Sequence, residues 1–272
     1  MSFGALAYPD IDPVALRFAG LQVRWYGLAY VSAFAGSFLL ARWIIRRWKL
    51  DISDDDMLSI ILAAVIGVVV GGRLGYVLLY SGGAGPRNLV DVIAIWSGGM
   101  SFHGGLAGVL IAGLVVARRL HIPWLTLGDL GAACAPIGLF FGRLANFIND
   151  ELWGRVTRVP WGVVFPSGGP MPRHPSQLYE AVLEGVVIFA VMIWLATRSN
   201  PPARGTMLGW LLTMYGAFRM LAELFRQPDV QIGFLPSGAT MGQLLSVPVL
   251  IGGIALLIWV RRHPLTQEGR TD

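Results

Sequence analysis

The stretch GRLANFINDELWG, which runs from Gly142 to Gly154, ends an apolar run that begins near Leu127. It places an arginine, two asparagines, an aspartate and a glutamate at the end of that run. Burying such groups in hydrocarbon costs several kcal/mol for each group unless it is paired or hydrated. An apolar segment that becomes so polar at one end indicates a membrane helix whose end lies beside a polar site.

The composition of the whole chain is that of a membrane protein. Of the 272 residues, 55% are apolar and only 14% are charged, whereas soluble domains carry about 25% charged residues. The mean hydropathy is +0.62. The net charge of +5 does not indicate nucleic-acid binding, because the basic residues are scattered between apolar runs and form no basic face. The single cysteine, Cys134, lies in an apolar run, so we expect a buried and unreactive thiol.

Seven stretches are apolar and long enough to cross a membrane as helices, which takes roughly 20 residues. The third is the shortest and is rich in glycine. We therefore predict an all-α, polytopic integral membrane protein with a single transmembrane domain over residues 1–272. The seven predicted spans are Trp25–Trp43, Met57–Tyr80, Phe102–Ala117, Leu127–Ile148, Gln177–Ala196, Met207–Leu224 and Gly238–Val260.

Arginine and lysine predict the orientation of these spans, because cytoplasmic loops carry an excess of both. Of the 21 basic residues, eleven follow the first, third, fifth and seventh spans and seven lie on the other side. We therefore expect the N-terminus outside and the C-terminus in the cytoplasm. The longer loops, residues 81–101, 149–176 and 225–237, then lie outside as a small extracytoplasmic head, where we expect any chemistry.

Helical spacing puts Arg143, Asn146 and Asp150 on one face at the outer end of the fourth span. Gly154 would join this face if the helix continued. Two interpretations are open. Arg143 could extend to the outer headgroups while the asparagines cap the helix, or the arginine and asparagines could face a polar cavity and hold an anion.

The sixth span carries a second polar face. Tyr215, Arg219, Glu223 and Arg226 recur every three or four residues and form one stripe. Arg219 and Glu223 could simply neutralise each other as an i,i+4 pair. Otherwise, ionisable residues within a membrane indicate a functional site.

Three further residues are candidates at the same outer level. His103 is framed by glycines 98, 99, 104 and 105, which allow a ligand to come close; both a structural and a catalytic role are open. Tyr26 opens the first span, where an interfacial aromatic residue is ordinary. Arg73 is the remaining cation inside a span. The histidines, cysteine and acids form no cluster at metal-ligand spacing, so we expect no metal site.

Together these residues favour an enzyme that handles a phospholipid headgroup at the outer leaflet. Arginines recognise phosphate with their forked donors, and a histidine can accept a proton near pH 7. The candidates are Tyr26, Arg73, His103, Arg143, Asn146, Glu151, Arg219 and Glu223.

The sequence GRLANFINDELWG closely resembles the signature of the prolipoprotein diacylglyceryl transferases, Gly-Arg-x-Gly/Ala-Asn-Phe-x-Asn-x-Glu-x-x-Gly. Every fixed position is matched, and six more blocks resemble the family in order between residues 24 and 246. These blocks are WYGLAY, GGRLGYVLLY, GGMSFHGGLAG, RHPSQLYEA, YGAFRMLAELFRQPD and MGQLLS. Arg24 stands where some members have histidine.

The resemblance implies a bacterial inner-membrane enzyme with seven helices and an outer N-terminus. Such enzymes transfer the diacylglyceryl group of phosphatidylglycerol to the lipobox cysteine thiol of a prolipoprotein. The products are a thioether and glycerol phosphate, and no cofactor is implied. The partners are these two substrates and membrane lipids.

The resemblance also implies roles for the candidates. Arg143 and Arg219 would bind the phosphate and stabilise charge on the leaving group. His103 would act as general base toward the thiol, or the arginines would favour the thiolate directly. The remaining roles are orientation of substrate and arginines by Tyr26, Asn146 and Glu151, support of Arg219 by Glu223, close approach of a loop at Gly154, and substrate contact by Arg73.

Two other classes fit less well. A transporter for an anionic solute would predict an internal repeat, and the motifs at 98–105, 142–154 and 215–226 do not resemble one another. An intramembrane serine protease needs serine and histidine on separate helices, whereas Ser101 and His103 are two residues apart.

Overall fold

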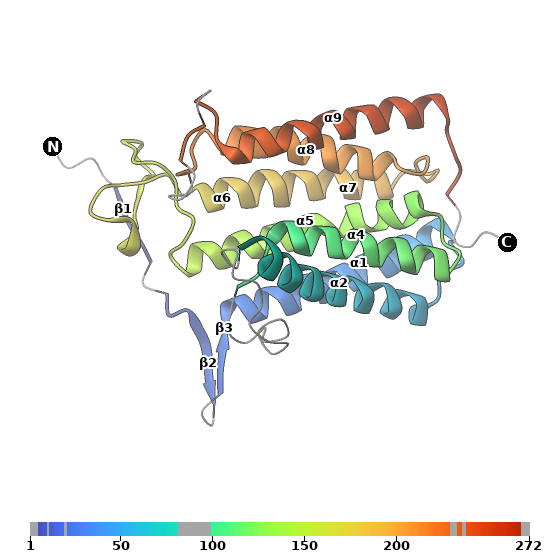
Figure 1. Cartoon of the computed structure of the whole chain (residues 1–272), viewed down its shortest axis with the longest axis horizontal. Helices are drawn as coiled ribbons and strands as arrows, with labels where there is room; N and C mark the ends of the chain where they lie inside the picture. The colour runs from blue at the N-terminus through green and yellow to red at the C-terminus, as the bar shows by residue number, and fades with distance from the viewer. Residues whose placement is uncertain are drawn as a thin grey trace. The chain divides into compact units, whose positions relative to one another are not determined.

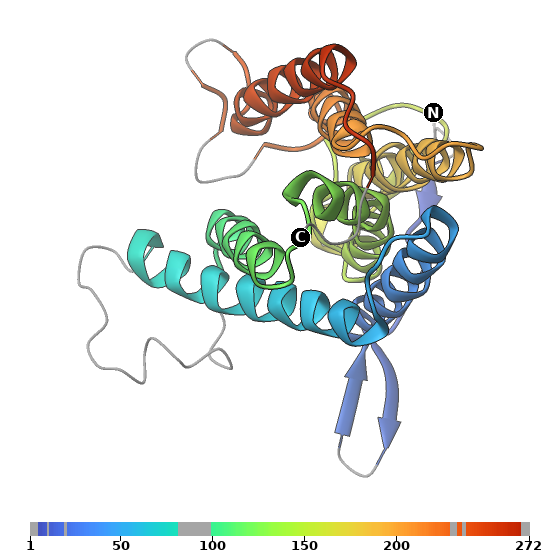
Figure 2. The same ribbon diagram turned by 90° about the vertical axis from the view of Figure 1, so that its right-hand side faces the viewer.

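The computed structural model describes residues 5–9, 11–18, 21–80, 99–228, 233–235 and 238–267 (Figures 1 and 2). The chain divides into two compact units. The first unit comprises Met1–Ala41 and Gly128–Thr266, and the second comprises Arg42–Leu127 and Gln267–Asp272. Most of the polar candidates belong to the first unit, whereas Arg73 and His103 belong to the second.

Each of the seven predicted spans is helical, and among the described residues five helices are long and apolar enough to cross a membrane. The fifth span runs through α6, a π-helical segment η3 and α7 without a break, as Figure 1 shows for α6 and α7. The prediction of a helical membrane protein is therefore confirmed at this level. The helices are α1 (Trp25–Trp48), α2 (Asp54–Tyr80), α4 (Phe102–Arg119), α5 (Trp124–Ile148), α6 (Ser176–Glu180), η3 (Ala181–Val187), α7 (Ile188–Ala196), α8 (Thr206–Ala222) and α9 (Met241–Arg262).

Charged residues extend several helices beyond their apolar cores, which the predicted bounds did not include. The first helix continues to Trp48, with Arg46 and Arg47 in its last turn. Helix α2 begins with three aspartates, starting at Asp54. Cations at a helix C-terminus and anions at an N-terminus interact favourably with the helix dipole, so these ends are stable as helix although they are not apolar.

Beside its helices, the described part of the first unit contains four short strands that the sequence did not predict. Strand β1 (Leu6–Ala7) pairs in parallel with β4 (Val163–Val164), and β2 (Val14–Phe18) pairs with β3 (Leu21–Arg24) as an antiparallel hairpin. The strands have only two to five residues, and β1 and β2 contain no buried residue, so no alternating pattern marks them. In Figure 1 they lie at the end of the first unit where α5 ends and α6 begins.

Close backbone contacts pack the helices within the first unit. A Cβ atom at Gly216 of α8 would lie 2.8 Å from the backbone nitrogen of Leu250 in α9, and one at Gly185 would lie 2.7 Å from Cβ of Phe140 in α5. Figure 2 shows α8 and α9 side by side. Small residues at such contacts let the helices approach closely. In a lipid bilayer, where the hydrophobic effect does not drive helices together, this close packing stabilises their association.

The second unit is built on an even closer contact between α2 and α4, which lie side by side in both views. A Cβ atom at Gly67 would lie 2.6 Å from the carbonyl oxygen of Gly108. The backbones of Gly71 and Gly104 meet in the same way one turn further on. The two helices therefore pack backbone against backbone, with glycine on both sides.

Candidate active site

The centre of the polar site in the first unit is Glu180, the last residue of α6. Its side chain is 0% exposed. One carboxylate oxygen lies 2.6 Å from Nη2 of Arg143 and 2.9 Å from Nη1 of Arg219, and the other lies 3.3 Å from Nη1 of Arg226. A carboxylate without solvent needs such partners, since an isolated buried charge is very costly. Glu180 thus holds three arginines from two helices and the segment after α8.

Glu223 is a second anchor for the same arginines. Its Oε1 lies 2.5 Å from Nη2 of Arg219 and 3.8 Å from Nε of Arg226. Its Oε2 accepts a hydrogen bond of 2.7 Å from the hydroxyl of Thr240, the residue before α9. The expected support of Arg219 by Glu223 is therefore present as an ion pair. The i,i+4 pair with Glu223 is not the whole explanation for Arg219, because Glu180 binds the same guanidinium.

Glu184, one turn beyond Glu180, completes the group and is held least tightly. Its side chain is 0% exposed, and its Oε2 has a single contact of 3.5 Å with Nη2 of Arg143. Its Oε1 has no hydrogen-bond partner among the residues that the structure describes. Glu184 lies in η3, and π-helical turns occur frequently at functional sites. We call the three arginines and three glutamates, residues 143, 180, 184, 219, 223 and 226, the Arg–Glu cluster.

A second polar group adjoins this cluster. The Tyr26 hydroxyl donates to Oε1 of Glu151 over 2.7 Å, and Nδ2 of Asn146 donates to the same oxygen over 2.8 Å and also to the Tyr26 hydroxyl. The backbone carbonyl of Glu151 accepts a 2.6 Å hydrogen bond from Nε2 of Gln177. These bonds fix residues from α1, α5 and the following loop against the start of α6.

The backbone joins the two groups into one site. Asn146 is one helical turn after Arg143 on α5, and Gln177 is one turn before Glu180 on α6. Arg143 does not extend toward the headgroups, since its Nη2 contacts Glu180 and Glu184; the interpretation that it only snorkels is wrong. In the described part of the chain its Nε and Nη1 have no partner, and its side chain is 17% exposed. These N–H groups can bind an anion.

The loop after α5 is shaped by unusual backbone conformations. The helix ends at Ile148, and Asp150 and Leu152 have positive φ angles of 55° and 58°. Asp150 consequently leaves the helical face, and its carboxylate accepts a 2.6 Å hydrogen bond from the backbone N–H of Ser167. Of the three residues predicted to share one helical face, only Arg143 and Asn146 do so, and Asp150 does not.

Gly154 lies where this loop passes between two other segments. Its N–H donates to the His174 carbonyl over 2.8 Å, and the N–H of Arg155 donates to the Phe225 carbonyl over 2.8 Å. A Cβ atom at position 154 would lie 2.6 Å from both of these carbonyl oxygens. Gly154 thus permits the close approach that holds the loop beside the end of α8.

We expect Gly154→Ala to destabilise the fold by about 1–3 kcal/mol, because the backbone must shift to admit the methyl group. Reversible unfolding in mixed micelles would measure this loss. Gly138→Ala is the matched control, since a Cβ at this position of α5 meets no atom within 4 Å. Equal stability of the two variants would contradict the steric role of Gly154.

His174 lies beside the loop in an aromatic cluster with Tyr179 and Phe225. Trp161 donates its indole N–H to the Tyr179 hydroxyl oxygen over 2.7 Å, and that hydroxyl lies 3.1 Å from Nδ1 of His174. The hydroxyl proton is thus available to an unprotonated Nδ1. Desolvation lowers the pKa of His174 from its ordinary value of 6.5.

We expect the stability of the fold to decrease in mild acid because His174 becomes protonated there. Because its pKa is lowered on folding, the unfolded chain binds the proton first, so its contribution is complete above about pH 6.5 and is lost as the pH falls. Between pH 7.5 and 5.5 the melting temperature should fall about 1–3 °C more in the parent than in His174→Gln. Parallel melting curves for the two proteins would refute this role.

The second unit holds the other two candidates. Arg73 of α2 is 6% exposed; its Nη1 donates to the Gly99 carbonyl over 3.1 Å, and its guanidinium lies 5.7 Å from the centre of the Tyr76 ring. His103 lies in the first turn of α4, whose N-cap is Ser101. The side chain of His103 lies outside the described part, as do residues 81–98 of the predicted outer loop.

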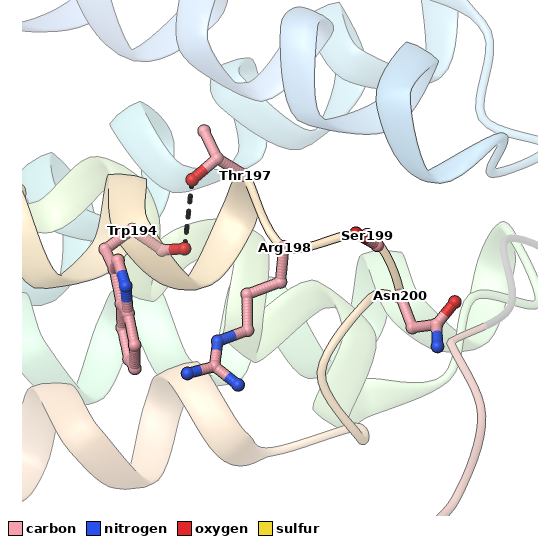
Figure 3. A pocket seen from close by; sticks show the side chains of 5 residues that line it. All are labelled: Trp194, Thr197, Arg198, Ser199 and Asn200. Atoms are coloured by element: carbon pink, nitrogen blue, oxygen red, sulfur yellow. Dashed lines mark hydrogen bonds between the residues drawn. The ribbon is translucent and has the colours of Figure 1, made fainter.

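A separate cavity of about 580 Å³ lies at the other end of α7 (Figure 3). Trp194, Thr197, Arg198, Ser199 and Asn200 line it, and Thr197 donates a 3.0 Å hydrogen bond to the Trp194 carbonyl. The Arg198 guanidinium lies 4.0 Å from the centre of the Trp194 ring. A paired tryptophan and arginine at a helix end is typical of a membrane interface. This lining offers no acid–base pair.

Sequence reasoning missed Glu180, Glu184 and Gln177. A signal was available, because two glutamates four residues apart in an otherwise apolar span are costly unless they serve a site. Tyr26, Arg143, Asn146, Glu151, Gly154, Arg219 and Glu223 are brought together in the first unit.

The apolar helices and the buried Arg–Glu cluster define a membrane-embedded protein with a site suited to an anionic group. Residues 13–259 match the family described as prolipoprotein diacylglyceryl transferase. The chain belongs to this family.

Named relatives cover nearly the whole chain. It is similar to the phosphatidylglycerol--prolipoprotein diacylglyceryl transferase of Geobacter sulfurreducens, with 47% identity over 258 residues, which are 95% of this chain and 98% of that protein. The enzyme of the same name from Rhodospirillum rubrum is 47% identical over 271 residues, 97% of this chain and 98% of that protein. That of Aliivibrio fischeri is 46% identical over 265 residues, 97% of this chain and 95% of that protein.

Proposed function

We propose that this chain transfers the diacylglyceryl group of phosphatidylglycerol to the lipobox cysteine thiol of prolipoproteins, the first step of lipoprotein maturation. The thiol sulfur forms a bond to the glycerol carbon, the bond from that carbon to the phosphate oxygen breaks, and glycerol phosphate leaves. Membership of the family supports the reaction. The observation that carries it here is Glu180, which holds Arg143 and Arg219 together with guanidinium N–H groups left over.

In this proposal Arg143 and Arg219 bind the phosphate. Nε of Arg143 and Nε of Arg219 are donors without a partner in the described residues, and the side chains are 17% and 14% exposed. Donors already oriented by buried carboxylates lose little freedom when charge develops on the departing phosphate. Glu180 therefore serves the site by holding the arginine donors in a fixed orientation.

The other candidates have supporting roles in the proposal. Tyr26, Asn146 and Glu151 orient the substrate through their shared hydrogen bonds. His103 accepts the thiol proton, and Arg73 contacts the substrate. Positioning of thiol and carbon for in-line displacement supplies much of the acceleration.

The membrane arrangement is also part of the proposal. We place seven spans in the bacterial inner membrane as one transmembrane domain, with the N-terminus outside and the C-terminus in the cytoplasm. The strands and the loop after α5 then form the extracytoplasmic head, and the Arg–Glu cluster faces the outer leaflet. The excess of arginine after the odd-numbered spans supports this orientation.

The test uses purified protein in micelles containing phosphatidylglycerol, with a lipobox peptide and with the same peptide carrying alanine for cysteine. We expect glycerol phosphate to be released only with the thiol peptide, and the peptide to gain the mass of the diacylglyceryl group. Folded protein that releases nothing with either peptide would contradict the enzyme and favour an anion transporter.

A further inference from the structure

The Arg–Glu cluster has equal numbers of acidic and basic side chains. With all six ionised, three arginines and three glutamates sum to zero charge. Phosphatidylglycerol carries one negative charge on its phosphate. When that phosphate binds to Arg143, the cluster and its ligand together hold one excess negative charge in a poorly solvated site. Such an excess favours the neutral form of a nearby carboxyl group.

The three glutamates differ in how firmly they are held as carboxylates. Glu180 has contacts of 2.6, 2.9 and 3.3 Å with three arginines. Glu223 has a 2.5 Å contact with Arg219 and accepts a 2.7 Å hydrogen bond from Thr240. Glu184 has one contact, at 3.5 Å, and a buried oxygen without a partner in the described residues. Of the three glutamates, Glu184 would therefore lose the fewest ion pairs and hydrogen bonds on being protonated.

Glu184 also lies beside the group that would bind the phosphate. The charged and titratable groups that face it are Arg143 from α5, Glu180 from α6, and Tyr215 and Arg219 from α8. A phosphate on the vacant N–H groups of Arg143 competes with Glu184 for the same guanidinium charge. The unpartnered Oε1 of Glu184 is the atom that can take up a proton without breaking a bond.

We infer that binding of the phosphatidylglycerol phosphate is coupled to protonation of Glu184, which keeps the Arg–Glu cluster and its bound phosphate together electrically neutral. This inference deepens the proposed function and rests on it. Glu184 is a positioning residue: it acts through Arg143, and it makes the affinity for the anionic lipid dependent on pH.

The experiment is calorimetric titration of short-chain phosphatidylglycerol into the full-length protein in maltoside micelles, in two buffers of different ionisation enthalpy. At pH 8 and above the parent should take up close to one proton for each lipid bound, and its affinity should fall there by up to about tenfold per pH unit. Glu184→Gln should bind the lipid with almost no proton uptake and a flat pH profile. Asp54→Asn, at an exposed pair with Arg42, should behave like the parent.

Binding by the parent without proton uptake would overturn the inference while leaving the proposed function intact. Uptake that persists in Glu184→Gln would overturn it as well, because another group would then take the proton. Absence of phosphatidylglycerol binding by the folded parent would contradict the proposed function itself.

If Glu184→Gln does not fold, the parent alone still decides the matter. Infrared difference spectra of the parent with and without phosphatidylglycerol, recorded in H₂O and in D₂O, should show a new protonated-carboxyl band, which shifts on deuteration whereas the ester bands of the lipid do not. A spectrum without this band would overturn the inference.

Discussion

Replacing Arg143 with alanine is expected to slow glycerol phosphate release by about 10²–10³-fold, the usual effect of removing a preorganised donor from developing negative charge. The proposed function makes Arg143 one of the two phosphate ligands, and its Nε and Nη1, which have no partner among the described residues, support this role. Single-turnover release from phosphatidylglycerol with a lipobox peptide measures the effect.

Arg143→Lys separates charge from geometry. A lysine keeps one positive charge but lacks the planar fork that matches two phosphate oxygens. We expect a rate between those of the parent and the alanine variant. Arg198→Ala, at the far end of α7, removes an arginine outside the site and should leave the rate unchanged. An alanine variant within about threefold of the parent would rule out transition-state stabilisation by Arg143.

The second large effect is expected at Glu180. Glu180→Ala leaves three buried or half-buried arginines without their common partner, and breaking a buried ion pair in this way costs about 3–5 kcal/mol. The free energy of unfolding in mixed micelles should fall by this amount. The rate of transfer should fall as well, because Arg143 and Arg219 lose their fixed orientation.

The matched control is the exposed ion pair between Arg42 and Asp54, whose atoms are 2.8 Å apart and whose side chains are 35% and 51% exposed. Asp54→Ala should cost less than about 1 kcal/mol, as is usual for surface pairs. Equal losses in Glu180→Ala and Asp54→Ala would mean that Glu180 does not organise the cluster.

The helices could be predicted from the sequence because their signal is local. A run of apolar residues long enough to cross a membrane must satisfy its backbone internally, so the seven stretches become helices whatever their neighbours are. The strands could not be predicted in this way. Leu6–Ala7 becomes a strand only because Val163–Val164, far along the chain, lies beside it.

The contrast between local and distant contacts also explains which parts of the site could be predicted. The pair of Arg219 and Glu223 is visible in the sequence, because both lie on one helix at i,i+4 spacing. Glu180 forms its bonds to Arg219 and Arg226 across 39 and 46 residues. No pattern within one segment indicates such a partner. The apolar residues around Glu180 could have indicated that it has one, but not which arginines provide it.

The contact between α2 and α4 has a consequence for the movement of lipids. At Gly67 and Gly108 the two backbones touch, so no side chain between them can rotate aside to make room for an acyl chain. A lipid with two chains could pass there only if the helices separated completely. We therefore expect no acyl chain to pass between α2 and α4, whereas one could lie along the outside of the seam, where both helices line an apolar hollow of about 420 Å³.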